Sequence, residues 1–313
     1  MTALDSLAAD LACPVCRAAL GRDDGAGSPG RLVCATGHGF DVARQGHVSL
    51  FDGRARASTG DTADRVARRD RFLSAGHYAP IASAVAALTP PTGLVADLAG
   101  GTGWYSAAVL DQHPDARGVS LDLSAFAARR AARAHPRLAA VVADAWRELP
   151  LADGSVSSVL SIFGPRSAAE IARVLRPGGR LIVVTPTSRH LDGVREQLGM
   201  LTMDARKDER LAESLGIFEL ESEERVETEL LLDAAALEDL VLMGPSAHHA
   251  DRERLAASIA RLLGDAGRAR ALLSVRVSRW TPRGEAVERV ERVKRVEREH
   301  AAGSTTEDDA AIR

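Results

Sequence analysis

The chain has 313 residues, enough for one large domain with an appendage or for two modest domains. Its 45% hydrophobic and 27% charged residues are ordinary for a soluble globular protein, and no apolar run approaches the roughly 20 residues that cross a bilayer. A net charge of −3 excludes a chain-wide polycation, so any binding of nucleic acid has to come from a local patch.

Two short turns near the N-terminus carry metal-binding side chains. Cys13 and Cys16 form the turn CPVC, and Cys34 and His38 form CATGH, where Gly37 eases a second turn. Three thiolates and one imidazole on paired turns match the ligands of a closed tetrahedral zinc site. Because four protein ligands leave no open coordination position, we expect a structural zinc that stabilises a segment too short for its own core.

Other interpretations of these residues are a disulfide, a redox pair, or an ordinary surface histidine at His38. A disulfide is disfavoured in a cytoplasmic chain. A redox CxxC pair has no use for Cys34 and His38 at this spacing, and no βαβ pattern surrounds it.

Three successive segments after the cysteine and histidine turns differ in their pattern of apolar residues. Apolar residues alternate with polar ones over 39–51, and the polar stretch 52–65 is typical of a connector. Apolar residues at helical spacing over 62–89 predict helical structure that ends before Pro90 and Pro91.

Strand and helix patterns then alternate along the chain. They predict strands over 93–100, 116–124, 138–147, 155–164 and 180–187, and helices over 104–114, 125–136 and 167–179. Such alternation predicts an α/β fold, with a parallel sheet covered by helices on both faces. Sheets of this kind bind ligands beyond the carboxyl ends of their strands, at the switch point.

The stretch VADLAGGTGWY, residues 95–105, lies at such a strand end. The spacing of Gly100, Gly101 and Gly103 differs from the G-x-G-x-x-G of dinucleotide-binding folds. Asp97 would repel a pyrophosphate and suits a cationic or amino-bearing ligand. A glycine-rich turn of another kind of α/β protein is the remaining alternative.

This stretch resembles the D-x-G-x-G-x-G loop of class I S-adenosylmethionine-dependent methyltransferases, and VLRPGGRLIVVTP is similar to their late helix, turn and strand. The resemblance implies a Rossmann-like domain in which Asp122 binds the ribose hydroxyls and Asp144 the adenine amino group. The glycines, Gly103 included, let the backbone pass close to the cofactor. Ala99 stands where the family usually has its first glycine, and costs little if φ there is negative.

CPVC, CATGHGFDVARQGHVSL, GDTADRVARRDRFLSAGHY and TPTSRHL occur together and in order. In this the chain resembles, from about Leu11 to about Gly244, the bacterial 23S ribosomal RNA guanine-N1 methyltransferases, which include tylosin- and mycinamicin-resistance enzymes. The resemblance implies a 23S rRNA hairpin as substrate, a homodimer, and a link to macrolide resistance. It also implies zinc ligation by the four residues above and cofactor contacts at Tyr78, Gly101, Thr102 and His190. From the residues alone, Tyr78 could equally be a core residue and His190 a helix cap.

Methylation at N1 needs a base, because N1 of neutral guanine carries a proton. Asp61 and His77 are the candidates. Four nearby arginines are clustered enough to contact RNA phosphate, or they form a solvated helix face: Arg65, Arg68, Arg69 and Arg71.

We expect a zinc-binding RNA-recognition module over 1–52, a joint helix over 53–75, a methyltransferase domain over 76–281 and a charged, solvated tail over 282–313. Residues 1–14 lack the basic segment of a signal peptide, so we expect a cytoplasmic protein. Two other functions stay open: a small-molecule or antibiotic methyltransferase on the same scaffold, and a non-catalytic zinc-dependent RNA-binding protein. Ala99 and the tail are the only features that favour the last.

Overall fold

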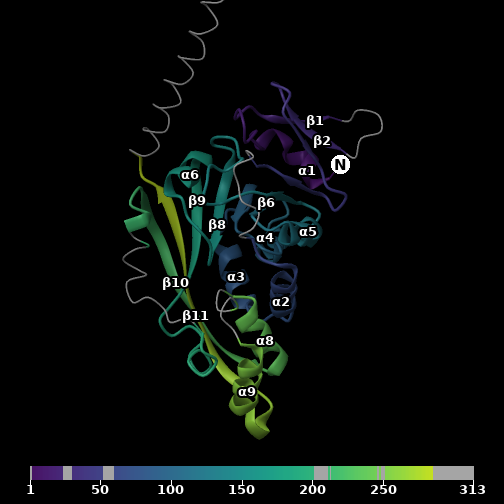
Figure 1. Ribbon diagram of the computed structural model, residues 1–313. Helices are drawn as coiled ribbons and strands as arrows, with labels where there is room; N and C mark the ends of the chain where they lie inside the picture. Colours follow the sequence, from purple (N-terminus) through teal and green to yellow (C-terminus); the bar gives the residue numbers. More distant parts are fainter. Residues whose placement is uncertain are drawn as a thin grey trace, which may run out of the picture.

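The computed structural model describes residues 2–23, 30–51, 60–200, 211, 213–244, 247 and 251–284. They form an eight-stranded mixed sheet and a smaller antiparallel sheet of three strands (Figure 1). Within this part of the chain, no helix is both long and apolar enough to cross a membrane. Most of the predicted charged tail, residues 285–313, lies outside the described residues.

The helices are α1 (Ala3–Leu7), α2 (Ala63–Ser74), α3 (Ala79–Leu88), α4 (Trp104–Gln112), α5 (Ala125–Ala134), α6 (Ala168–Val174), α8 (Ala234–Leu242) and α9 (Arg252–Leu263). The strands are β1 (Leu20–Asp23), β2 (Arg31–Cys34), β3 (Gly39–Asp41), β4 (His47–Ser49), β5 (Gly93–Leu98), β6 (Ala116–Asp122), β7 (Leu138–Val142), β8 (Val156–Ile162), β9 (Leu175–Pro186), β10 (Phe218–Leu232) and β11 (Ala269–Pro282).

The large sheet has the order β10-β11-β9-β8-β5-β6-β7-β4. Strands β4 to β9 pair in parallel, whereas β11 runs antiparallel to both β9 and β10. The chain winds outward from β5 through β6 to β7, then crosses to β8 on the other side of β5. This reversal places the switch point at the carboxyl ends of β5 and β8.

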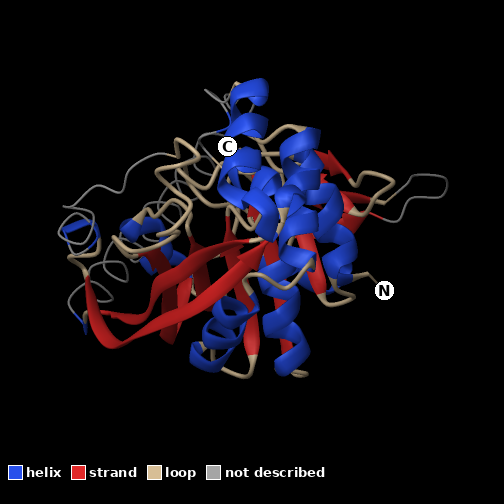
Figure 2. Ribbon diagram, turned by 90° about the horizontal axis from the view of Figure 1, so that it is seen from below, coloured by secondary structure: helices blue, strands red, loops and turns tan. Residues whose placement is uncertain are grey.

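Helices cover both faces of the sheet, so the predicted α/β fold is confirmed (Figure 2). Successive residues of β5 point to opposite faces, as in any strand. Val95 belongs to a core with α3 and α4, while Leu94 and Ala96 belong to a second core with α6. That second core also contains Leu4 and Leu7 of α1. The N-terminal segment therefore packs directly onto one face of the sheet.

The structure differs from the expectations at three places. The helical stretch 62–89 is two helices, because the chain turns at Gly76, where φ is +81°. Strand β9 begins at Leu175, ahead of the predicted start at 180. The long strands β10 and β11 were not predicted; they extend the sheet on the side of β9.

Strand β4 lies before residue 52, the predicted end of the zinc-binding module, yet it pairs with β7 of the large sheet. Leu50 N–H continues this pairing by donating to Val142 O at 3.0 Å. The predicted domain boundaries stay predictions, but the two parts of the chain share a sheet edge and a core.

Candidate active site and zinc centre

A cavity of about 350 Å³ lies at the switch point, and we call it the switch-point cavity. Its walls come from the loop after β5, from the residues that follow β6, β7 and β8, and from α2. Six of the eight predicted cofactor-binding residues line it: Tyr78, Asp97, Gly101, Thr102, Asp122 and Asp144. Residues more than 60 positions apart thus meet in one place, as the strand-end argument predicts.

Asp97 is a buried carboxyl group at the end of β5, and only 1% of its surface is exposed. Ser106 of α4 donates a hydrogen bond of 2.7 Å to its Oδ2. Burial raises the pKa of Asp97 to about 7, and the nearby charge of Asp122 adds to the rise. A bound cation would stabilise the ionised form, so the site favours an amino-bearing ligand.

The loop after β5 passes close to this carboxylate. A Cβ on Gly100 would lie 2.5 Å from Ser120 Oγ and 2.9 Å from Asp97 Oδ2, so no larger residue fits there. Gly101 has φ of +57°. The hydroxyl oxygen of Thr102 is buried and has no hydrogen-bond partner among the described residues. An unsatisfied hydroxyl beside the cavity fits a ligand that supplies the missing partner.

Gly103 and His190, the other two predicted contacts, do not line the cavity. A Cβ on Gly103 would meet Leu138 Cδ2 at 2.8 Å, so this glycine lets α4 pack closely on β7. His190 lies behind Tyr78, with its Nε2 at 3.4 Å from Tyr78 Oη. Ser274 N–H donates to His190 Nδ1 at 3.3 Å, which leaves the Nε2 proton for the tyrosine oxygen.

Ala99 has φ of +54°, so the condition under which it would cost little is not met. An alanine in this left-handed conformation costs about 1–2 kcal/mol. The extra freedom of glycine in the unfolded chain offsets about 0.4–1 kcal/mol of that. We expect Ala99→Gly to raise the free energy of unfolding by roughly 0.5–1 kcal/mol, measured by urea denaturation.

The matched control is Ala256→Gly, at an exposed position inside α9. Glycine there should lower stability by about 1 kcal/mol. If both variants lowered the free energy of unfolding equally, Ala99 would not be strained.

Asp122 holds the glycine loop against β6. Its Oδ2 accepts a hydrogen bond from Gly101 N at 2.9 Å, and its Oδ1 accepts one from Ser124 N at 2.8 Å. Burial raises its pKa, and the two hydrogen bonds oppose the rise. Asp144 accepts a hydrogen bond of 2.9 Å from Trp146 N in the loop after β7. Both carboxylates keep lone pairs that can accept hydrogen bonds from a ligand.

The two candidate bases differ in position. Asp61 lines the cavity, where it forms ion pairs with Arg65, at 2.9 Å, and with Arg69. His77 is not among the lining residues; its ring packs on Phe72 at 4.7 Å between centroids, and burial lowers its pKa. Only Asp61 is therefore placed where it could touch a substrate.

The clustered arginines of α2 all form ion pairs with carboxylates, although the Arg71 side chain stays 57% exposed. Arg68 reaches Asp239 of α8 at 3.0 Å, and Arg71 reaches the same carboxylate at 2.6 Å. Arg69 donates to Met243 O at 2.7 Å, besides its ion pair with Asp61. These residues join α2 to α8.

Two aromatic residues at the cavity were missed by sequence reasoning. Phe163, directly after β8, has φ of +55°, unusual for a bulky residue, and the residue is 43% exposed. Its centroid lies 6.2 Å from that of Tyr78. Trp146 is 73% exposed. Neither belongs to a periodic pattern, so only their position near the carboxyl end of a strand could have singled them out.

The four predicted zinc ligands converge, with their donor atoms all within 4.8 Å of one another. Cys16 Sγ lies 3.6 Å from Cys34 Sγ, and His38 Nδ1 lies 3.7 Å from Cys13 Sγ and 3.4 Å from Cys34 Sγ. Zinc–sulfur bonds of about 2.3 Å in a tetrahedron give donor separations near these values. A hydrogen bond with the Thr36 hydroxyl lowers the pKa of Cys34 to about 5, which favours the thiolate that a metal binds. The residues fit a closed zinc site.

Two family models match the chain. One, described as a methyltransferase domain, matches residues 95–179; the other, a zinc ribbon described as the N-terminal part of RlmA, matches residues 11–58. The 23S rRNA (guanine(748)-N(1))-methyltransferase of Streptomyces fradiae is 46% identical over 261 residues, covering 81% of this chain and 91% of the relative. A 23S rRNA (guanine-N(1)-)-methyltransferase of Micromonospora griseorubida is 46% identical over 271 residues, covering 80% and 91%. The chain belongs to the 23S rRNA (guanine-N1)-methyltransferases.

Membership of the 23S rRNA (guanine-N1)-methyltransferases confirms the predicted family, enzyme class and cofactors, S-adenosylmethionine and structural zinc. A more distant relative, from Bacillus subtilis, is 31% identical over 196 residues, covering 59% of this chain and 67% of the relative.

Proposed function

We propose that this protein transfers a methyl group from S-adenosylmethionine to N1 of a guanine in a hairpin of 23S rRNA. The observation that carries the proposal is the convergence of three strand-end carboxyl groups, Asp97, Asp122 and Asp144, on the switch-point cavity. Three acidic groups around one hollow suit the amino group, the ribose hydroxyls and the adenine amino group of the cofactor.

The chain's residues then divide the work. Asp97 would bind the cofactor's amino group, Asp122 its ribose and Asp144 its adenine, while Gly101 and Thr102 would lie along the methionine portion. Gly103 and His190 act indirectly, because they pack α4 and hold Tyr78 rather than line the cavity.

The target guanine has an exposed aromatic surface to stack on at Phe163. When bound in the switch-point cavity, S-adenosylmethionine would supply the methyl group for N1. The N1 proton must leave to a base, for which Asp61 is the better placed candidate. It forms ion pairs with Arg65 and Arg69, and a carboxylate oxygen can accept a hydrogen bond from N1–H.

We also propose that the protein is cytoplasmic, since its substrate is ribosomal RNA. We propose further that it is a homodimer, as its family resemblance implies, and that methylation lowers macrolide sensitivity. Light scattering tests the dimer, and a monomer at working concentration would contradict it. Macrolide inhibition of strains with and without the gene tests resistance.

The reaction is tested on 23S rRNA purified from a strain that lacks the gene. Purified protein and S-adenosylmethionine should methylate one guanine at N1, as mapped by nuclease digestion and mass spectrometry. Cofactor binding without methylation of RNA would favour a small-molecule methyltransferase. RNA binding without cofactor binding would favour the non-catalytic alternative.

A further inference from the structure

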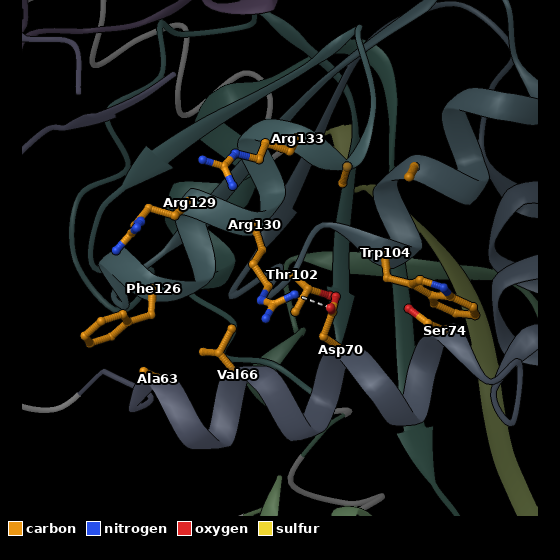
Figure 3. Close-up of a pocket in the computed structure, with 12 residues that line it drawn as sticks. Ala63, Val66, Asp70, Ser74, Thr102, Trp104, Phe126, Arg129, Arg130 and Arg133 are labelled. Atoms are coloured by element: carbon orange, nitrogen blue, oxygen red, sulfur yellow. Dashed lines mark hydrogen bonds and ion pairs between the residues drawn. The ribbon is translucent and has the colours of Figure 1, made fainter. Parts of the chain in front are cut away.

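A second hollow, of about 540 Å³, lies between α2 and α5 beside the start of α4, and we call it the α2–α5 groove. Figure 3 shows α2 along one side and the side chains of α5 on the other. Val66, Asp70 and Ser74 line it from α2, at the spacing of successive helical turns. The groove is no part of the three-carboxylate site.

The α5 side of the groove is basic. Arg129, Arg130 and Arg133 line it, and Asp70 is the one carboxylate among the lining residues. Arg130 forms an ion pair with Asp70 across the groove (Figure 3). Arg129 and Arg133 are exposed and form no ion pair or side-chain hydrogen bond with any residue that the structure describes. Two guanidinium groups one helical turn apart are therefore available to an anion.

This contrasts with the arginines of α2. Arg68 and Arg71 are held by Asp239, and Arg69 by Asp61 and a backbone carbonyl. A basic helix whose charges serve only packing would pair them in the same way. The α5 arginines instead face a hollow, within a chain whose net charge is −3.

Aromatic side chains accompany the charge. Phe126 of α5 is 47% exposed, although it lies in a helix that packs its alanines on the sheet. Trp104, at the start of α4, lines the groove at the opposite end from Phe126 (Figure 3). Guanidinium groups beside open aromatic rings are the combination with which proteins hold single-stranded nucleic acid, through phosphates and stacked bases.

The groove adjoins the switch-point cavity. Thr102 lines both, and α2 separates them, with Asp70 and Ser74 on the groove side and Arg69 and Leu73 on the cavity side. A helix with its side chains is about 10–12 Å across. A strand in the groove would therefore lie within one or two nucleotides of a base in the cavity.

We propose that the α2–α5 groove binds the RNA strand next to the target guanine, with Arg129 and Arg133 on its phosphates and Phe126 against a base. Charge complementarity selects this occupant, because an acidic polymer is the partner that suits two arginines with no ion pair among the described residues. The inference rests on the proposed function, since the ligand is the RNA substrate itself.

The test uses the full-length protein and a fluorescein-labelled 23S rRNA hairpin containing the guanine that the wild type methylates. Arg129→Gln/Arg133→Gln should weaken hairpin binding on the order of 10²-fold or more, since two charge-assisted hydrogen bonds are lost. The slope of log K against log salt should fall by about 1.4–1.8, the loss of two phosphate contacts. KM for the hairpin should rise with kcat little changed, and the affinity for S-adenosylmethionine should stay the same.

Two further variants separate the effect of local charge in the groove from that of total charge and from that of base stacking. Arg254→Gln/Arg261→Gln removes the same charge from exposed positions on α9 and should leave hairpin binding and the salt slope unchanged. Phe126→Ala should weaken binding about tenfold with the wild-type salt slope, because stacking depends little on salt.

A double variant of α5 that is folded by circular dichroism and binds the hairpin like the wild type, with the same salt slope, overturns the groove assignment alone. An equal loss in the α9 control also overturns it, since total charge would then explain the effect. A wild type that neither binds nor methylates the hairpin overturns the proposed function as well.

Discussion

Asp122→Ala is expected to weaken binding of S-adenosylmethionine on the order of 10²-fold or more, as measured by isothermal titration. Two hydrogen bonds from the ribose to a charged acceptor are worth roughly 1.5–3 kcal/mol each. The same substitution also releases Gly101 N–H and Ser124 N–H, which now donate to the carboxylate at 2.9 and 2.8 Å. The substitution therefore removes both the hydrogen bond that holds the glycine loop to β6 and the acceptor for the ribose. The loss of cofactor affinity should exceed that from the ribose contacts alone.

Two controls accompany this measurement. Asp122→Asn keeps one acceptor oxygen and should lose less affinity than the alanine variant. Asp115→Ala removes an exposed carboxylate just before β6, at the far end of the strand, and should bind the cofactor normally. RNA affinity should barely change in any of them. A folded Asp122→Ala protein with wild-type cofactor binding would mean that the pocket is misplaced.

Cys16→Ser is expected to release about one zinc ion per chain and to loosen the N-terminal segment, because a structural zinc contributes directly to folding free energy. Zinc content by mass spectrometry and hydrogen exchange of residues 11–50 measure the two effects. Since Cys13 and Cys34 belong to a core that continues into the large sheet, the loss should also lower the thermal unfolding midpoint of the whole protein.

The matched variant is His38→Cys, which keeps four ligands of a type that zinc accepts and should retain the metal. Full zinc occupancy in Cys16→Ser, with unchanged exchange, would rule out the assigned ligand set.

Sequence reasoning anticipated which residues lie together where the determinants are local. Asp97, Asp122 and Asp144 each lie at or just beyond the carboxyl end of a recognisable strand, and parallel strands bring these ends to one edge. The zinc ligands are likewise set by two short turns. In both cases a few neighbouring residues set the local geometry. The parallel sheet then brings the carboxylates together, and the donor types identify zinc as the metal.

Sequence reasoning missed contacts whose partner lies far along the chain. The arginines of α2 read as an open basic cluster because Asp239, about 170 residues later, is invisible to a local pattern. The contact of His190 with Tyr78, 112 positions away in the chain, was likewise not foreseen, and its predicted contact with the cofactor stays a prediction. The strain at Ala99 is a matter of backbone angle, which no residue type alone reveals.

Strand β4 matters for how the protein can be divided. A chain cut at residue 52 would leave β7, with all five residues buried in the intact protein, as a bare sheet edge with unpaired N–H and C=O groups. It would also uncover the core surface that Leu4 and Leu7 now cover. Exposed apolar edge strands pair with other copies and aggregate. The methyltransferase half is therefore not a free-standing catalytic fragment, and chimeras that exchange the zinc segment need to carry β4 and α1 along with the metal ligands.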